Sequence, residues 1–405
     1  MSHELCIPQS SIKPPDSILG LSRLIEQDPR SEKINAGVGV FRDESGKTYT
    51  PQSILLAWEK LEFGKVDYLS PSGKREFLGD EVFLNETVGL ALGMQGNNLL
   101  NQGRISAIGT VGGTGAIATF ADVIKQLSPG SSILIGNPSW PNHFQIAQSR
   151  QLEIIKYDQS TENNTFNFEG ALEAIKKSPE KTIVLFHAGE SHNPSGVNPS
   201  ADEWKELARG MSGRFAFFDA PYLGLSSNIF QDSMAMKIFL EENVPIAVAV
   251  SYAKNCGLYN ERPGALIIPA STNTKATEMQ RLLNWCARSS YSSPPAHGEK
   301  LVTTMLEDLT LKNLWLSDLE KAVVILNKRR KIFAENVPQF DFVAKQHGLF
   351  SLLPLNDEAV LRLRREYAVY IPNGGRINIG GVTSEQMALF AKAIKEVLLQ
   401  SPKLW

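Results

Sequence analysis

The segment best suited to chemistry surrounds Lys254, in the run Ser251-Tyr-Ala-Lys254-Asn-Cys-Gly-Leu-Tyr-Asn-Glu-Arg262-Pro-Gly264. It directly follows an apolar run at 246–250 that is typical of a strand, and open α/β sheets bind their ligands just beyond strand ends. A lysine amine forms Schiff bases with carbonyl compounds once burial or a cationic neighbour lowers its pKa. Arg262 is a candidate for that neighbour. We therefore expect Lys254 to act as a nucleophilic amine and not as a solvated loop lysine.

A glycine-rich turn, Gly112-Gly113-Thr114-Gly115, precedes a helix that is expected over residues 116–127. Free backbone N–H groups and the positive end of the helix dipole make such a turn a good phosphate site. A dinucleotide site would also need an acidic residue about 20 positions later to hold a ribose. Residues 133–140, ILIGNPSW, contain no acid, so the turn predicts one phosphate and not a dinucleotide.

An acidic residue, Asp219, ends the apolar run in Phe217-Phe218-Asp219-Ala-Pro-Tyr222. An acid at the end of a central strand can keep the nitrogen of a pyridine ring protonated, and the alternative interpretation is a helix cap. Two Asn-Pro steps, at 137–138 and 193–194, also follow predicted strands, although such steps usually mark only turns. Trp140, close to the first step, has a ring that could stack on a planar cofactor.

Two isolated arginines complete the candidate set. Arg376 lies in the turn Gly374-Gly-Arg376-Ile-Asn378, and Arg288 lies shortly before Pro294-Pro295. Arginine binds carboxylates through two parallel hydrogen bonds, but each residue taken alone fits a surface position better. The six histidines and three cysteines have no metal-ligand spacing, so we expect no metal site.

The elements that must position these residues alternate between strands and helices through the middle of the chain. Short apolar runs without polar alternation are typical of strands buried on both faces of a mostly parallel sheet. Such runs occur at 132–135, 182–186, 215–218, 246–250 and 265–268, and helices are expected at 116–127, 201–208 and 278–287. The pattern predicts an α/β fold with a mostly parallel sheet flanked by helices.

The C-terminal part follows a different pattern. A long amphipathic helix is expected over 314–336, and its cationic run Lys328-Arg329-Arg330-Lys331 is interpreted as a solvated helix face. Shorter helices are expected over 358–367 and 384–399. Two strands are expected around Asn373-Gly374, a step typical of a β-hairpin turn. This part predicts a smaller α+β domain.

Composition and charge exclude several functions. The chain has 405 residues, 43 acidic and 41 basic side chains, and a net charge of −2, which argues against nucleic-acid binding. Its apolar stretches are far shorter than the roughly 18–20 residues that span a bilayer, and its first residues lack the pattern of a signal peptide. Three cysteines are too few for a disulfide framework. We expect a cytoplasmic protein of enzyme size without a membrane partner.

Nine segments together resemble, in order, the aspartate aminotransferase family of fold-type I pyridoxal-phosphate enzymes. They are INAGVGVFRDESGKT, DYLSPSG, GGTGAI, NPSWPNH, HNPSG, FFDAPYLG, SYAKNCGLYNERPG, RSSYSSPPAHG and GGRINIGG. The resemblance extends from about Pro15 to Leu399. It implies an N-terminal arm at 1–13, a large cofactor-binding domain at 47–312, and a smaller domain built from both chain ends, at 14–46 and 313–405.

The resemblance implies pyridoxal 5'-phosphate as the cofactor. Lys254 resembles the lysine that forms the internal aldimine and then moves a proton on the substrate. Asp219, with His143 behind it, resembles the acid on the pyridine nitrogen, and Tyr222 is implied with them as catalytic. The other implied contacts are Tyr222 and Asn193 to the phenolic oxygen, Gly113, Thr114, Ser251 and Arg262 to the phosphate, Trp140 against the ring, and Tyr68 to the phosphate of the neighbouring subunit.

The same resemblance implies the substrates, which are amino acids and 2-oxo acids. Arg376 and Gly39 resemble the groups that hold the substrate α-carboxylate, beside Trp140 and Asn193. Arg288 resembles the arginine that a partner subunit gives to the distal carboxylate. The implied protein is a homodimer with shared active sites that transfers the amino group of L-aspartate to 2-oxoglutarate.

Alternative functions stay open at this point. Ser293 precedes Pro294 where aspartate-preferring members usually have Asn, and serine occurs there in the branch that also accepts aromatic amino acids. The alternative function is therefore that of an aromatic amino acid aminotransferase with the same site. Two further departures are the extra residue in HAGESHNPSG, which contains Glu190, and Ala253 in place of Ser or Thr.

Two other classes of protein fit less well. A nicotinamide-dependent dehydrogenase would use GGTGAI as its cofactor loop, but the acid for the ribose is missing and Lys254 would have no role. A catalytically inactive binding protein would have no use for Lys254, Asp219, Tyr222 and both arginines together.

Overall fold

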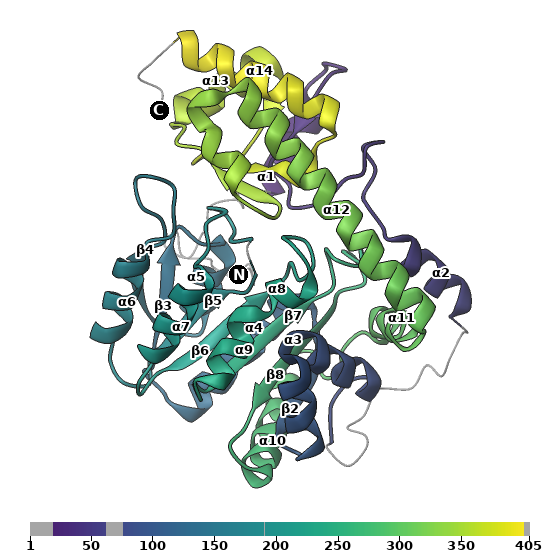
Figure 1. Cartoon of the computed structure of the whole chain (residues 1–405), viewed down its shortest axis with the longest axis vertical. Helices are drawn as coiled ribbons and strands as arrows, with labels where there is room; N and C mark the ends of the chain where they lie inside the picture. The colour runs from purple at the N-terminus through teal and green to yellow at the C-terminus, as the bar shows by residue number, and fades with distance from the viewer. Residues whose placement is uncertain (1–18, 62–75, 190, 401–405) are drawn as a thin grey trace, which may run out of the picture.

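The computed structural model describes residues 19–61, 76–189 and 191–400, and its centre is a seven-stranded sheet (Figure 1). The strand order is β2-β8-β7-β6-β5-β3-β4. All neighbouring pairs are parallel except those that β8 makes with β2 and β7. The strands are β2 (Ile105–Val111), β3 (Ser132–Asn137), β4 (Glu153–Asp158), β5 (Ile183–His187), β6 (Phe215–Ala220), β7 (Ile246–Ser251) and β8 (Pro263–Pro269).

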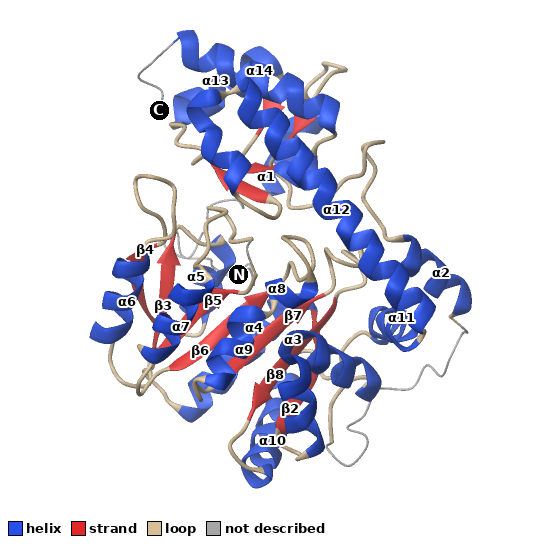
Figure 2. Ribbon diagram, viewed as in Figure 1, coloured by secondary structure: helices blue, strands red, loops and turns tan. Residues whose placement is uncertain are grey.

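Helices cover both faces of this sheet (Figure 2). One face packs on α4 (Gly112–Leu127), α5 (Pro141–Ser149) and α10 (Asn273–Ser290). The opposite core includes α3 (Glu81–Asn101), α6 (Phe168–Lys177), α7 (Ala201–Arg209), α8 (Ile229–Asp232), α9 (Met234–Glu241) and α11 (Ala296–Glu307). The α/β architecture with a mostly parallel sheet is therefore confirmed.

In the seven-stranded sheet the five predicted strands are all present, and the structure adds β2 and β4, which the sequence pattern did not predict. Strands β5 and β7 are buried along their whole length, which explains their unbroken apolar runs. Strand β2 is also buried, but Ser106, Gly109 and Thr110 interrupt its apolar pattern. Strand β4 lies at the edge of the sheet with exposed polar side chains, so it has no continuous apolar run.

The antiparallel strand β8 has a direct consequence for the loop that follows β7. Because β8 runs back beside β7, the chain returns at the same edge of the sheet without a crossover. Ser251 pairs with Gly264 across this return. The loop between them therefore keeps Lys254 and Arg262 at the carboxyl ends of the parallel strands.

A smaller α+β part is built from both chain ends, as predicted (Figure 1). In this part β1 pairs with β10 in parallel, and β9 pairs with β11 in antiparallel orientation. The predicted boundary at 312–313 falls inside one continuous helix, α12, and the domain boundaries stay predictions. The elements outside the large sheet and its helices are α1 (Leu19–Gln27), β1 (Ile34–Asn35), α2 (Gln52–Lys60), α12 (Leu309–Asn336), η2 (Pro338–Lys345), β9 (Phe350–Leu352), α13 (Asp357–Tyr367), β10 (Val369–Tyr370), β11 (Arg376–Asn378), η3 (Ile379–Gly381) and α14 (Ser384–Gln400).

The hairpin predicted around Asn373-Gly374 is wrong. The chain turns there, with positive φ angles of 83° at Gly374 and 76° at Gly375. However, β10 before the turn pairs with β1, and β11 after it pairs with β9. The two flanking strands belong to different sheets, because segments far away in the sequence occupy their edges.

The interpretation of Lys328-Arg329-Arg330-Lys331 as a solvated face is wrong for its two arginines. Lys328 and Lys331 are exposed, but Arg329 and Arg330 are fully buried. Arg329 contacts Glu44 at 2.9 Å. Arg330 donates to the carbonyl oxygens of residues 343, 347, 348 and 350 and to the Ser351 hydroxyl. Acceptors from distant segments thus replace water around both guanidinium groups.

Among the described residues, no helix combines the length and the apolar character that crossing a membrane requires. The predicted N-terminal arm at 1–13, Tyr68 and Glu190 lie outside the described residues.

Candidate active site

A cavity of about 240 Å³ lies at the carboxyl ends of the parallel strands, between the sheet and the smaller part. Its walls include residues that follow β3, β5, β6 and β7, the first turn of α4, and residues near β1, β9 and β11. The structure brings together eleven of the residues predicted from the sequence: Gly39, Gly113, Thr114, Trp140, Asn193, Asp219, Tyr222, Ser251, Lys254, Arg262 and Arg376. This is the edge at which parallel sheets of this kind bind ligands.

Lys254 forms part of the wall of this cavity and is half-buried. Its Nζ lies 5.2 Å from the centre of the Tyr222 ring. Burial and the charge of Arg262 lower the pKa of the Lys254 amine to about 8, against the opposing effect of Asp219. An amine with this pKa exchanges protons in the neutral range, as a general base or a nucleophile must.

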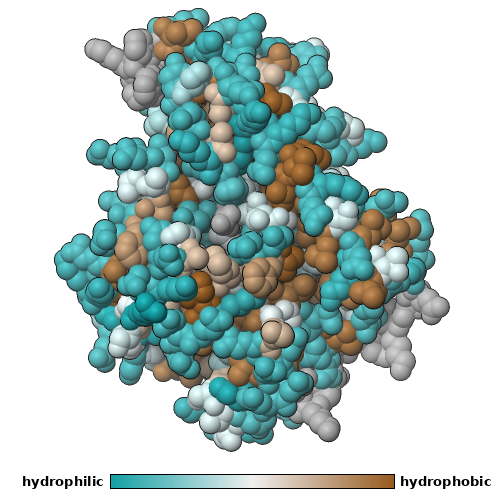
Figure 3. Space-filling view, in the orientation of Figure 1, coloured by the Kyte–Doolittle hydropathy of each residue, from teal (hydrophilic) through white to brown (hydrophobic). Residues whose placement is uncertain are grey.

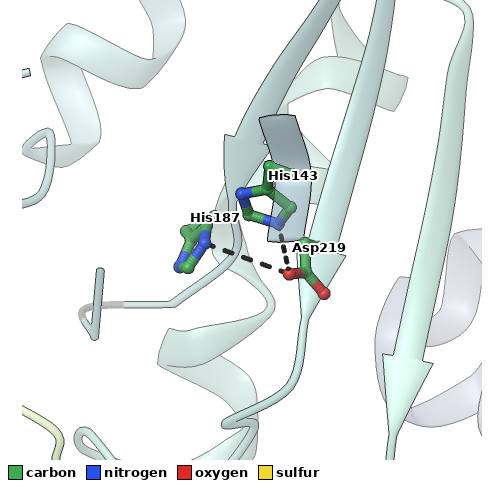
Figure 4. A group of neighbouring side chains, drawn as sticks. All are labelled: His143, His187 and Asp219. Atoms are coloured by element: carbon green, nitrogen blue, oxygen red, sulfur yellow. Dashed lines mark hydrogen bonds and ion pairs between the residues drawn. The ribbon is translucent and has the colours of Figure 1, made fainter. Parts of the chain in front are cut away.

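Asp219 is a buried carboxylate at the penultimate position of β6, and its partner is His143 on α5. Figure 4 shows His143 directed at the carboxylate, with a distance of 2.8 Å between Nε2 and Oδ2. His143 Nδ1 lies 2.9 Å from the Ser139 hydroxyl, which fixes the orientation of the ring. Burial opposes ionisation, but the hydrogen bond and charge of His143 hold the pKa of Asp219 below its usual value. The carboxylate is therefore negative at neutral pH.

His143, His187 and Asp219 form the one cluster of possible metal ligands found among the described side chains. His187 Nε2 is 3.9 Å from Asp219 Oδ2, and burial lowers the pKa of His187 to about 3. Oδ2 of the carboxylate is already bonded to His143 (Figure 4). The arrangement supports a charged Asp219 that faces the cavity.

The first turn of α4 forms a cradle for an anion. Gly112 has φ of +64°, and a Cβ there would lie 2.5 Å from Nη2 of Arg262. A Cβ on Gly113 would come within 3.2 Å of Ser251 Cβ and 3.9 Å of Asp219 Oδ1. The absence of side chains at both glycines thus leaves room beside Thr114, Ser251 and Arg262. Backbone N–H groups, hydroxyls and one cation in this arrangement suit a phosphate group.

Arg376 stands at the other side of the cavity and is nearly buried. Its Nη1 donates to Asn193 Oδ1 at 3.3 Å, and its Nη2 donates to the Gly37 carbonyl at 2.6 Å. Its guanidinium lies 4.8 Å from the ring centre of Phe350. Asn193 also donates to the Tyr222 hydroxyl at 3.4 Å. The cation is therefore held in one orientation at the cavity wall, where it can bind a carboxylate.

Two of the predicted residues that the structure describes do not line the cavity. His143 lies directly behind Asp219. Arg288 is exposed at the end of α10, and its Nη1 donates to the Ser292 hydroxyl at 2.6 Å. Tyr68 lies outside the described residues. A position for Arg288 or Tyr68 in a neighbouring subunit's site stays a prediction.

Four residues of the cavity wall were missed: Ile117, His187, Pro221 and Phe350. His187 ends β5 and pairs with Asp219 near the end of the next strand in the sheet, so its place after an apolar run was an available signal. Phe350 had no such signal in the sequence. Its position beside Arg376 and Tyr222 depends on the turn at 346–351, which Arg330 holds from α12.

A second and larger cavity, of about 530 Å³, lies at the opposite ends of the strands. Lys181, Arg209, Arg214 and Glu242 are among its lining residues. Arg209 is already paired with Glu206 and Glu242, and the Arg214 guanidinium donates to Ser178 and to nearby carbonyls. None of the residues selected from the sequence lies there.

Comparison with known proteins assigns the chain to a family. Residues 31–394 match the family model described as aminotransferase class I and II. The chain is 35% identical over 398 residues to the mitochondrial aspartate aminotransferase of Arabidopsis thaliana, covering 96% of this chain and 91% of that protein. An aromatic amino acid aminotransferase from Burkholderia cenocepacia J2315 has a TM-score of 0.90 at 28% identity, covering 96% of this chain and 98% of that one. A third, the aromatic-amino-acid aminotransferase of Burkholderia pseudomallei covalently bound to pyridoxal phosphate, has a TM-score of 0.89 at 30% identity, with coverage of 96% and 98%.

Proposed function

The chain belongs to the class I and II aminotransferase family, and from this premise we propose that it transfers the amino group of L-aspartate to 2-oxoglutarate. The products would be oxaloacetate and L-glutamate. The observation that carries this proposal is the meeting of Lys254, Asp219 and Arg376 around one cavity. They are an amine with a lowered pKa, a buried carboxylate and a cation held for a carboxylate.

We propose pyridoxal 5'-phosphate as the cofactor of this site. When bound, it withdraws electrons from the substrate α-carbon, which is chemistry that side chains do not supply. The glycine cradle at the start of α4 fits its phosphate, and the charged Asp219 fits its ring nitrogen. The residues proposed to hold it are Gly113, Thr114, Trp140, Asn193, Asp219, Tyr222, Ser251, Lys254 and Arg262, with His143 behind Asp219 and Tyr68 from the partner subunit.

Lys254 is the proposed acid and base of the reaction. Its Nζ would take the proton from the substrate α-carbon and pass it to the cofactor carbon that receives the amino group. In the second half-reaction, the reverse transfer would protonate the α-carbon of the 2-oxo acid. With a pKa of about 8, the amine can serve in both directions near neutral pH. Since substrate and lysine share one cavity, the proton transfer is intramolecular, and orientation supplies part of the rate.

Arg376 is proposed to bind the α-carboxylate of the substrate, beside Gly39 and Asn193. A second charge is needed to select a dicarboxylic acid, and among the described residues the cavity wall contains no arginine besides Arg376 and, on the cradle side, Arg262. We propose that Arg288 of the partner subunit supplies it. This makes the active form a homodimer with shared sites.

Exposed apolar side chains support a dimer surface. Leu55 and Trp58 on α2 and Leu309 and Leu316 on α12 are all exposed by more than a third. Figure 3 shows apolar surface on the side formed by α2, α11 and α12. Exposed apolar patches of this kind often mark contacts between subunits. The cytoplasmic location expected from the sequence stays a prediction.

A second candidate substrate class is the aromatic amino acids. Ser293 before Pro294 favours it, and two of the structures compared above are named aromatic amino acid aminotransferases. The same cavity would serve both classes, because Arg376 binds the α-carboxylate that all amino acids share.

Kinetics with aspartate, phenylalanine and tyrosine against 2-oxoglutarate test the proposal. The purified protein is expected to be yellow, with a visible band that borohydride abolishes by fixing the cofactor to Lys254. Aspartate should have the highest kcat/KM. A higher kcat/KM for phenylalanine or tyrosine would favour the second candidate, and no amino transfer from any of the three would contradict both.

A further inference from the structure

The hydroxyl of Tyr259, on the cofactor side of the cavity, accepts a hydrogen bond from the backbone on the substrate side. The Phe41 N–H donates to the hydroxyl oxygen of Tyr259 at 2.8 Å. Tyr259 lies between Lys254 and Arg262 in the loop after β7, and its own carbonyl accepts from Arg262 Nη1 at 3.0 Å. One tyrosine thus connects the proposed phosphate ligand with the segment that contains Gly37 and Gly39.

We define residues 36–41 as the substrate wall, because Gly37 accepts from Arg376 and Gly39 lines the cavity. The smaller part holds this wall from one side. The Asn35 side chain accepts from the N–H groups of Gly37 and Val38, and the Asn378 side chain donates to the carbonyls of residues 38 and 40. Tyr259 holds it from the side of the large sheet.

This connection matters because Gly39 has no side chain that could fix its own position. The backbone beyond it is set by the Phe41 amide and by the buried Phe41 ring, which packs 4.9 Å from Tyr49. Without the Tyr259 hydroxyl, the Phe41 N–H would lose its hydrogen-bond acceptor. A donor in such a place is costly to leave unpaired, so the wall would have to shift toward water.

Burial raises the pKa of Tyr259 to about 12, although the Phe41 hydrogen bond and Arg42 act in the opposite direction. The hydroxyl is therefore neutral throughout the usual working range. Its function as an acceptor does not change with pH there.

We propose that Tyr259 is a positioning residue that aligns the substrate wall with Lys254, so that carboxylate binding depends on its hydroxyl and cofactor retention does not. The inference rests on the proposed function, since it takes Gly39 and Arg376 as the substrate side of the site. It adds a connection between the two sides that is made by a residue outside the cavity wall.

Tyr259→Phe in the full-length holoenzyme tests this inference, with Tyr49→Phe as the matched control. Tyr49 lies a few residues beyond the wall, and its hydroxyl donates to the Asp318 carbonyl of α12 at 2.9 Å. Both variants remove one hydroxyl that ties the same N-terminal segment to another element. Three quantities are measured: cofactor content by visible absorbance, binding of succinate by calorimetry, and the single-turnover half-reaction with aspartate.

Tyr259→Phe should weaken succinate binding and raise the apparent dissociation constant for aspartate by about 5- to 30-fold, the range for an unpaired donor that is worth one to two kcal/mol. Cofactor content should equal that of the wild type. Tyr49→Phe should change succinate binding by less than about twofold, since its bond to α12 does not bear on the wall.

The inference is overturned if Tyr259→Phe binds succinate like the wild type, if both variants weaken binding equally, or if Tyr259→Phe loses its cofactor. The last result would assign Tyr259 to the cofactor loop alone. Failure of the proposed function is a separate result, because a wild-type protein that transfers no amino group contradicts that function whatever the variants do.

Discussion

The two arginines proposed for substrate carboxylates sit in contrasting surroundings. Arg376 is only 6% exposed, and its guanidinium is held by the Asn193 side chain, the Gly37 carbonyl and the face of Phe350. Arg288 is exposed at the end of α10, and its hydrogen bond is to a nearby serine hydroxyl.

This difference separates the carboxylate-binding groups that one chain positions by itself from those that it does not. On the proposed function, the α-carboxylate that every amino acid has would be bound by groups that the same chain holds in place. The second carboxylate would be bound by an exposed arginine that a partner subunit contributes. Affinity for amino acids in general and selection of dicarboxylic ones should therefore respond to different changes.

The largest effect is expected for Lys254→Ala, which removes one of the groups that a single chain holds in place. The variant should bind the cofactor without a covalent bond, and turnover should fall by at least about 10²- to 10⁴-fold, since the proton at the α-carbon has lost its acceptor. Steady-state turnover with aspartate measures the loss. Lys275→Ala, which removes an exposed lysine of α10, is the control and should behave as the wild type. Near-normal turnover of Lys254→Ala would be incompatible with the site as proposed.

A direct comparison of the arginines uses two substrates. Removal of one partner of a buried charge pair costs about 2–5 kcal/mol, which corresponds to about 30-fold to several-thousand-fold in kcat/KM. Arg376→Ala should show such a loss with both aspartate and phenylalanine. Arg288→Ala should show it with aspartate and far less with phenylalanine, which has no distal carboxylate. The amino-donor half-reactions must be measured separately, because 2-oxoglutarate also carries two carboxylates.

Equal losses for both substrates in Arg288→Ala would mean that this arginine supports the architecture of the site and does not select dicarboxylic acids.

A mixture of two inactive proteins tests whether Arg288 acts across a subunit boundary. When Lys254→Ala and Arg288→Ala subunits exchange freely, half of the dimers are mixed, and each mixed dimer has one site with both groups intact. About one quarter of the wild-type activity should return. No recovery after verified subunit exchange would argue that each chain uses its own Arg288.

A smaller effect, on stability, is expected from the buried side chain of Glu299. Glu299 on α11 is fully buried, accepts from the Asp80 N–H at 2.8 Å, and lies against Gly109, which also contacts Pro294. Burial raises the pKa of Glu299 to about 8, and the charge of Asp80 adds to this. Between the pKa of Glu299 in the unfolded chain and about pH 8, the folded protein therefore keeps a proton on Glu299 that the unfolded chain has released. The free energy of unfolding consequently falls as the pH rises through this range.

Between pH 7 and pH 9 this group should lower the free energy of unfolding by about 1 to 1.5 kcal/mol. Glu299→Gln, which keeps the shape without the charge, should remove that part of the pH dependence. Chemical denaturation at the two pH values measures both proteins. An unchanged slope in the variant would show that Glu299 is not the titrating group.

The sequence predicted much of the site because most of its residues lie at the ends of strands with local, unbroken apolar patterns. Asp219 lies near the end of β6 and Lys254 follows β7 at the same edge of the sheet, so topology alone brings them together. Phe350 was missed because its place depends on a turn held by a buried arginine from another element.

The errors share one physical origin. The helical pattern of residues 328–331 contains no sign of the acceptors at Glu44 and in residues 343–351 that bury two of its charges. Likewise, the Asn373-Gly374 turn gives no indication that Ile34 of β1 pairs with Val369 of β10. In each case a partner from a distant segment overrides the local pattern.

The pairing of β1 with β10 also has a consequence for synthesis of the chain. Ile34 pairs with Val369, and Asn35 with Tyr370, so the paired residues are 335 positions apart in the sequence. At about 5–20 residues per second, the ribosome needs roughly 17 to 67 seconds to make the second strand after the first. The strands of the large sheet are all complete before then. The substrate wall, which follows β1 directly, is therefore among the last parts of the site to acquire all its partners, and a nascent chain halted before residue 369 lacks Arg376 and Asn378.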